Sequence, residues 1–216
     1  PYLTRILLRT PITANGVTWL MILVGASIGP ALLIQGWAGI ALALVLSHKQ
    51  MLIDCCDGEV ARWRNTKSPM GIFLDKLGHY LAEGLLPICF GLRLANWPNE
   101  QTTDSIFPFL GALLAILVIV NKGLNDAVHV ARAFSGLPKI QDKSGINMPV
   151  KGILRRIRKL FNFIPAQRMF HSVEFTMYVA LFGTFSQSLE IALGISLFVT
   201  IGHIAAIVSS AKLRNN

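Results

Sequence analysis

Long apolar segments separated by short polar stretches make up most of this chain, and they predict a bundle of helices that cross a membrane. A helix needs roughly 20 residues to span the hydrocarbon core of a bilayer, and each segment approaches or exceeds that length. Six transmembrane helices are expected, at residues 17–34, 38–56, 70–94, 105–133, 169–185 and 189–211. We therefore expect an all-α integral membrane protein that forms a single domain over residues 1–216.

Two further stretches are predicted to lie outside the bilayer. Residues 1–12 alternate basic and apolar positions before Pro11, which is typical of a short helix lying in the membrane interface. Residues 135–167, between the fourth and fifth segments, are rich in Lys and Arg and predict a basic cytoplasmic loop.

Composition agrees with a membrane protein and argues against an ordinary soluble domain. The chain has 216 residues, of which 53% are hydrophobic and only 14% are charged. The formal charge of +9 at pH 7 raises the alternative of a nucleic-acid-binding protein, because clustered Lys and Arg bind phosphates. The positions of these charges decide between the two classes.

Lys and Arg collect at the amino terminus, at residues 62–67, at residues 139–168 and in the tail, whereas the candidate loops near Gln35 and over 95–104 contain none. Basic residues mark the cytoplasmic loops of membrane proteins. This distribution predicts a protein of the cell membrane with both termini on the cytoplasmic side, in contact with anionic lipids and not with nucleic acid.

Four ionisable side chains interrupt the apolar pattern near the cytoplasmic ends of the second and third segments. Asp54 and Asp57 are three residues apart and share one helix face, and Asp75 and His79 are four apart and share another. Packing of the two helices would bring all four into one pocket. Carboxylates near hydrocarbon are costly, so a divalent cation is expected, with Mg²⁺ or Mn²⁺ favoured by oxygen ligands.

Small and basic residues follow the first two aspartates. Gly58 and Ala61 lie one turn apart, which leaves room for a flat ring or, alternatively, for a neighbouring helix. Arg62 follows directly and suits a phosphate or one of the aspartates.

These residues belong to the run DCCDGEVARWRNTKSPMGIFLDKLGH, which resembles the signature of the CDP-alcohol phosphotransferase family, D-x2-D-G-x2-A-R-x8-G-x3-D-x3-D. It matches at every position but the last, where this chain has His79. The resemblance implies a six-helix, usually homodimeric, fold. It also implies transfer of a substituted phosphate from a CDP-linked alcohol to a second alcohol, with release of CMP, in phospholipid or polar-lipid biosynthesis.

The resemblance also implies roles for individual residues. Asp54, Asp57 and Asp75 correspond to ligands of one or two Mg²⁺ (or Mn²⁺) ions. The residues expected to contact the CDP moiety are Asn15, Thr18, Gly58, Ala61, Arg62, Ser68 and Gly71.

His79 occupies the position that the family uses both as catalytic base and as a metal ligand. An imidazole, with an ordinary pKa of about 6.5, is suited to accept the proton of the attacking hydroxyl, and Glu83 one turn later could orient the ring. The alternative is a structural histidine in a weakened enzyme. A nitrogen ligand in this place would also weaken a second Mg²⁺ site.

The sequence identifies the substrates less clearly than it identifies the motif. Because the membrane opens laterally to lipid, the expected donor is CDP-diacylglycerol or a similar lipid, and the acceptor an alcohol or a phosphorylated polyol. Acceptor-binding candidates lie at helical spacing on the fourth segment, at Lys122, Asp126, His129 and Arg132. A basic belt at the interface explains the same residues without an acceptor.

Two other functions compete with the enzyme. A catalytically weak or inactive family member could bind CDP-lipid and metal as a scaffold or regulator, which the missing fourth aspartate favours. A small transporter or channel would place ionisable residues through the depth of the bilayer. Here they gather toward one side, which disfavours transport.

Overall fold

The structure is a computed structural model that describes residues 2–99, 105–137 and 169–209, and all regular elements in these ranges are helices. They are α1 (Tyr2–Leu8), α2 (Ala14–Leu32), α3 (Trp37–Trp63), α4 (Pro69–Leu94), α5 (Phe107–Phe134), α7 (Ser172–Phe182) and α8 (Gln187–Ser209). The predicted all-α fold is confirmed for this part of the chain. The predicted basic loop over 135–167 falls almost entirely outside the described residues.

Four helices are long and apolar enough to cross a membrane, namely α2, α3, α5 and residues 187–205 of α8. α4 has 26 residues, but Asp75, Lys76 and Glu83 lower its hydropathy. α7 is an apolar helix of 11 residues, shorter than the segment predicted over 169–185. These helices indicate an integral membrane protein. The count of six spans and the interfacial position of α1 stay predictions.

The local sequence explains where the helices of the site begin. Thr13 caps α2, since its side-chain oxygen accepts a hydrogen bond from the Gly16 amide at 3.1 Å. Ser68 caps α4 in the same way through the Gly71 amide, and Pro69 occupies the first helical turn, where no amide donor is needed. Gly36 supplies a φ of +77° in the tight turn between α2 and α3.

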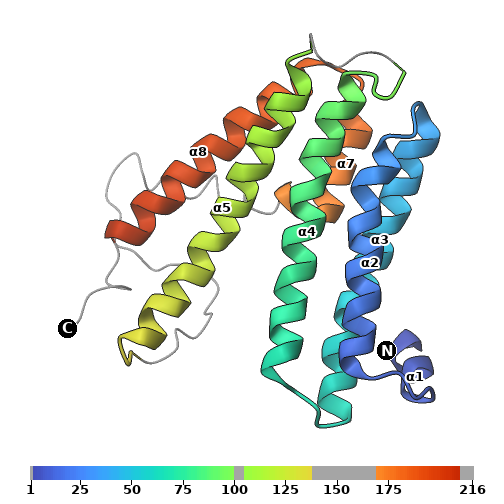
Figure 1. Cartoon of the computed structure of the whole chain (residues 1–216), viewed down its shortest axis with the longest axis vertical. Helices are drawn as coiled ribbons and strands as arrows, with labels where there is room; N and C mark the ends of the chain where they lie inside the picture. Colours follow the sequence, from blue (N-terminus) through green and yellow to red (C-terminus); the bar gives the residue numbers. More distant parts are fainter. Residues whose placement is uncertain (1, 100–104, 138–168, 210–216) are drawn as a thin grey trace.

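The helices pack so that the apolar core and the polar residues lie at different levels of the bundle. α2 lies against both α3 and α4, α4 contacts α5, α5 contacts α8, and α3 contacts α7 (Figure 1). The main core cluster lies toward the end where α2 leads into α3, and includes Leu32, Phe90, Leu114 and Phe175. The end that holds the amino terminus is left for the polar motif.

Two arginine side chains donate hydrogen bonds to backbone carbonyl groups of connecting segments. The Arg93 guanidinium donates to the carbonyl oxygens of Leu32 and Ile34 at 2.7 Å and of Gly36 at 2.8 Å, which satisfies the free end of α2. Arg64 donates to carbonyl oxygens of the last turn of α1 and of the segment that follows it, among them that of Thr10 at 2.7 Å. Arg64 thereby ties the amino-terminal segment to the end of α3.

α4 and α5 approach each other closely where they cross at a pair of glycines. A Cβ built on Gly91 would lie 3.1 Å from the Cα of Gly111 and even closer to the Phe107 carbonyl oxygen. Small residues at such crossings let helix backbones touch in membrane proteins. From this crossing the two helices diverge toward the end that holds the polar residues (Figure 1).

We predict that Gly91→Ala destabilises the bundle, because the added methyl group meets backbone atoms that cannot move aside. Overpacking of this kind costs about 1 to 3 kcal/mol, which should lower the melting temperature in detergent by several degrees. The fluorescence of the 4 tryptophans provides the readout. Gly194→Ala on α8 is the matched control, since its Cβ would meet nothing within 4 Å. Equal melting temperatures for the two variants would contradict the prediction.

Candidate functional site

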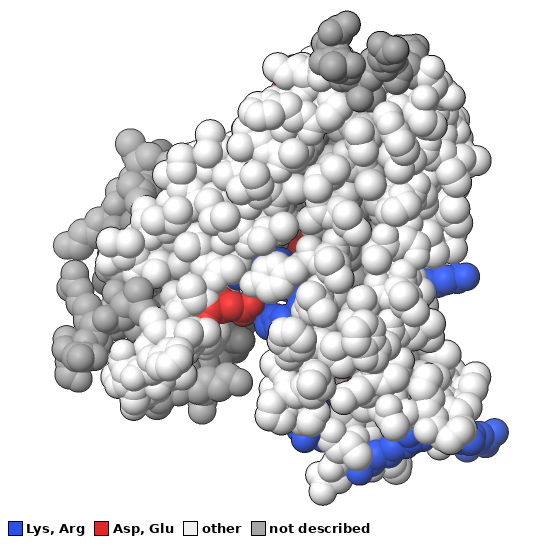
Figure 2. Space-filling view, in the orientation of Figure 1, with Lys and Arg blue, Asp and Glu red and all other residues white. Residues whose placement is uncertain are grey.

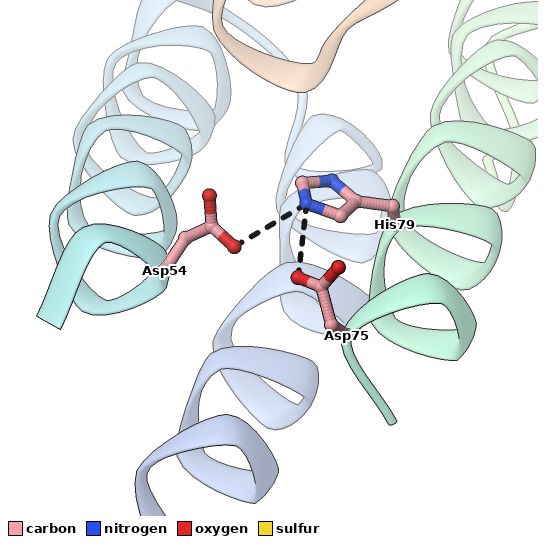
Figure 3. A group of neighbouring side chains, drawn as sticks. All are labelled: Asp54, Asp75 and His79. Carbon is pink, nitrogen blue, oxygen red and sulfur yellow. Dashed lines mark ion pairs between the residues drawn. The ribbon is translucent and has the colours of Figure 1, made fainter. Parts of the chain in front are cut away.

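Three ionisable side chains from two helices converge at the polar end of the bundle. Asp54 extends from α3, Asp75 and His79 extend from successive turns of α4, and the three side chains face one another (Figure 3). Nε2 of His79 lies 3.3 Å from Oδ1 of Asp54 and 3.6 Å from Oδ1 of Asp75. The predicted convergence of the second and third apolar segments is therefore observed for these residues.

The arrangement fits a divalent cation. One ligand atom from each of Asp54, Asp75 and His79 lies within 4.8 Å of the other two, and all three side chains are half-buried. Two carboxylate oxygens and one imidazole nitrogen suit Mn²⁺, and the carboxylates also suit Mg²⁺. These residues could hold one ion.

Asp57, the fourth predicted ligand, is turned toward α2. Its Oδ2 accepts a hydrogen bond from the Thr18 hydroxyl at 2.8 Å, and Thr18 also donates to the Ala14 carbonyl oxygen. Asp57 lies outside the group of three, so its role as a ligand stays a prediction. Thr18, expected to contact CDP, here holds this carboxylate in place.

Two other predicted nucleotide contacts meet beside the aspartates. A Cβ on Gly58 would lie 3.4 Å from Nη1 of Arg62, so the guanidinium group lies over the bare glycine. Arg62 is exposed and Ala61 is half-buried on the same helix. The missing side chain at Gly58 thus makes room for the arginine, and a flat ring would have to enter beside it.

Asn15, Ser68 and Gly71 come together where α2 and α4 both begin. A Cβ on Gly71 would lie 3.3 Å from Oδ1 of Asn15 and 3.6 Å from Oγ of Ser68. Gly71 therefore allows close approach of the two helix starts. Ser68 already serves as the cap of α4, a structural role that its place before Pro69 could have indicated.

A second polar cluster lies one turn beyond His79. The sequence did not predict that its residues come together. Glu83 is 2% exposed, and its Oε1 accepts hydrogen bonds from Lys122 Nζ on α5 at 2.6 Å and from His171 Nδ1 at 3.0 Å. The sequence suggested Glu83 as a partner of His79 but gave no signal for its contact with His171. His171 precedes α7 and reaches α4 only through packing.

The predicted acceptor face on α5 is largely paired with α4. Lys122 binds Glu83, and Asp126 binds Lys76 at 3.1 Å and the Tyr80 hydroxyl at 2.7 Å. Figure 2 shows charged side chains in the hollow between these helices, on a face that is otherwise mostly uncharged. His129 and Arg132 are half-buried farther along α5. The basic residues Lys139, Lys143 and Lys151, which follow α5 in the sequence, lie outside the described residues.

Three histidines lie apart from the group around Asp54. His48 bonds the Leu44 carbonyl oxygen and, with Lys49, borders an open apolar hollow of about 570 Å³ between α3 and α7. His203 on α8 binds Asn121 on α5 at 2.7 Å, and is thus a polar link between helices. His171, the third, bonds Glu83 as described above.

Comparison with known proteins gives one clear match. The family model described as CDP-alcohol phosphatidyltransferase matches residues 11–201, which is most of the chain and includes every residue of the site. No curated protein matches the sequence.

Proposed function

The chain belongs to the CDP-alcohol phosphatidyltransferase family, and from this we propose that it is a membrane enzyme that transfers a substituted phosphate from a CDP-linked lipid to an acceptor alcohol. The observation that carries the proposal is the convergence of Asp54, Asp75 and His79 in an otherwise apolar bundle. Ionisable groups at such a position are costly and are retained for a function. CDP-diacylglycerol or a lipid of the same class is the proposed donor.

The proposed reaction is a displacement at the phosphorus next to the lipid. The acceptor hydroxyl oxygen forms a bond to the β-phosphorus, the bond from that phosphorus to the oxygen of CMP breaks, and CMP leaves. Nε2 of His79 takes the proton of the hydroxyl, as a general base in reach of the pocket. A divalent ion held by Asp54 and Asp75 would neutralise the diphosphate and stabilise CMP as leaving group.

We assign most of the other residues of the signature and its surroundings to the donor. Arg62, exposed beside Gly58, would bind a phosphate of CDP by charge-assisted hydrogen bonds. Asn15, Ser68 and Gly71, which meet at the start of α2 and α4, would border the nucleotide. Asp57, held by Thr18, would complete the ligand set after a change of side-chain rotamer.

The acceptor is proposed to enter between α4 and α5, where these helices diverge (Figure 2). Lys122 and Asp126 have partners on α4, and we propose His129 and Arg132, farther along α5, as further contacts for a phosphorylated polyol. We place this end of the bundle at the cytoplasmic face, in accord with the positions of Lys and Arg in the sequence, and expect a homodimer.

The experiment that tests this function is product analysis. The purified protein, in detergent or in lipid nanodiscs, is given CDP-diacylglycerol, Mg²⁺ or Mn²⁺, and a panel of polyols and phosphorylated polyols. We expect CMP release together with a new lipid detected by mass spectrometry. Binding of the CDP-lipid without CMP release under all conditions would instead support the scaffold alternative that His79 raises.

A further inference from the structure

Glu83 lies deep in the bundle and is held by partners from two other segments. Its side chain is 2% exposed on α4, and its Oε1 receives Lys122 from α5 and His171 from the segment before α7. A single buried carboxylate would be strongly disfavoured, and the Lys122 ammonium group together with the His171 hydrogen bond offsets that cost. The Glu83 side chain is thus held in one rotamer, whereas a surface side chain moves between several.

The same carboxylate also approaches His79. Nδ1 of His79 lies 3.6 Å from Oε1 of Glu83, too far for a hydrogen bond but within ion-pair distance. Both Nδ1 of His79 and Oε2 of Glu83 are buried and have no hydrogen-bond partner among the described residues. Buried polar atoms in folded proteins are almost always satisfied. These two unsatisfied atoms belong to side chains that already approach to 3.6 Å, which points to a hydrogen bond between His79 and Glu83 after a small rotation.

We propose that Glu83 is a positioning residue for His79. The Glu83 carboxylate accepts a hydrogen bond from Nδ1–H of His79 and so directs Nε2 of the same ring toward Asp54 and Asp75. The inference rests on the proposed function, since it states how an imidazole is made to replace the carboxylate of the family signature. A neutral imidazole carries one proton, and the hydrogen bond of one nitrogen fixes which nitrogen keeps a lone pair. With the proton on Nδ1, Nε2 is available to the pocket.

The same contacts give Lys122 and His171 a role that differs from acceptor binding. They hold Glu83 in its rotamer, because their bonds to Oε1, at 2.6 and 3.0 Å, leave Oε2 as the oxygen that can turn toward the ring. Partners of this kind orient a histidine ligand or base without touching the substrate. The positions of α5 and α7 are thereby coupled to the orientation of His79.

The decisive test is a double-mutant cycle in which the rate of CMP release is measured. In the wild-type background, Glu83→Gln should lower kcat by about ten- to a hundredfold and change the KM for CDP-diacylglycerol little. In the His79→Asp background the same change should cost less than about threefold, because an aspartate has no Nδ1 to orient. A purely structural role for Glu83 would cost the same in both backgrounds, and equal losses would overturn the proposal.

A second measurement does not need activity. Nitrogen-15 NMR of the full chain in micelles, with labelled histidine and His79 assigned by its loss in His79→Asn, should show a proton on Nδ1 of His79. A ring without a proton on Nδ1 would overturn the proposal even if no substrate were known. If Nδ1 carries the proton and shifts in Glu83→Gln but no CMP is ever released, the positioning stands and the proposed function fails. Glu190→Gln, on an exposed residue of α8, is the control that should shift nothing.

Discussion

Replacing Asp54 with Asn should nearly abolish CMP release, with a loss of about a thousandfold in kcat. Asp54 is the member of the group that α3 contributes, and the other two residues come from α4. Without its charge the pocket keeps one carboxylate of the three-residue group, and a divalent ion loses a ligand. Ion stabilisation of the transition state is worth several kcal/mol, and about 4 kcal/mol corresponds to roughly a thousandfold in rate.

Two further readouts separate loss of the ion from loss of the fold. Binding of Mn²⁺, followed by electron paramagnetic resonance, should weaken in Asp54→Asn, while the melting temperature in detergent should stay the same or rise, since two carboxylates no longer repel each other. Glu190→Gln makes the same chemical change on an exposed part of α8 and should leave the rate and the Mn²⁺ affinity unchanged. Activity within tenfold of the wild type would contradict a role for Asp54 in holding an ion.

The comparison of His79→Ala with His79→Asp has the second-largest expected effect. General base catalysis contributes about a hundred- to ten-thousandfold, so the Ala variant should lose on that order in kcat. The Asp variant restores the carboxylate of the family signature and should keep most of the activity. Initial rates of CMP release at saturating donor provide the measurement, and undiminished activity in the Ala variant would rule out His79 as the base.

The same two variants report on the choice of metal. A site with an imidazole nitrogen accepts Mn²⁺ more readily than one made of oxygens alone, which suits Mg²⁺. Nε2 has one lone pair, so it cannot bind an ion and take the proton of the hydroxyl at the same time. With His79 as the base, we therefore expect the ratio of rates with Mn²⁺ and Mg²⁺ to change little in His79→Asp relative to the wild type. A large fall in the ratio would indicate that Nε2 is a metal ligand and would contradict the base role.

Charged groups that α4 and α5 place near the site are paired across helices. Lys76 pairs with Asp126, Lys122 pairs with Glu83, and His79 lies between Asp54 and Asp75. Charges placed in an apolar bundle are tolerated when they are paired across helices. This pairing explains how α4 can carry many ionisable residues and still pack between α2 and α5.

The interpretation of the acceptor face shows where sequence spacing is insufficient. Lys122 and Asp126 do lie on one side of α5, as their spacing of four residues predicts. Spacing alone does not say what the opposite helix offers, and here α4 presents Glu83, Lys76 and Tyr80 to these two residues. Which side chains remain for a substrate therefore depends on the pairing of two helices that are distant in sequence.

Much of this protein was determined by the sequence alone. Apolar segments of membrane-spanning length predicted helices close to those observed, since burial of apolar surface and internal backbone hydrogen bonding allow little else in a bilayer. The spacing of Asp54, Asp75 and His79 along two consecutive helices predicted their convergence, because a short loop forces such helices to pack side by side. The family followed from the same residues and is confirmed by the match over 11–201.

The tertiary structure alone decided which partners these residues have. Asp57 shares a helix face with Asp54, yet it bonds Thr18 because α2 packs against that side of α3. His171 reaches Glu83 across 88 residues of sequence, a contact that no local pattern contains. Local periodicity fixes the direction in which a side chain leaves its helix, whereas the helix that it meets is fixed by the packing of the whole bundle.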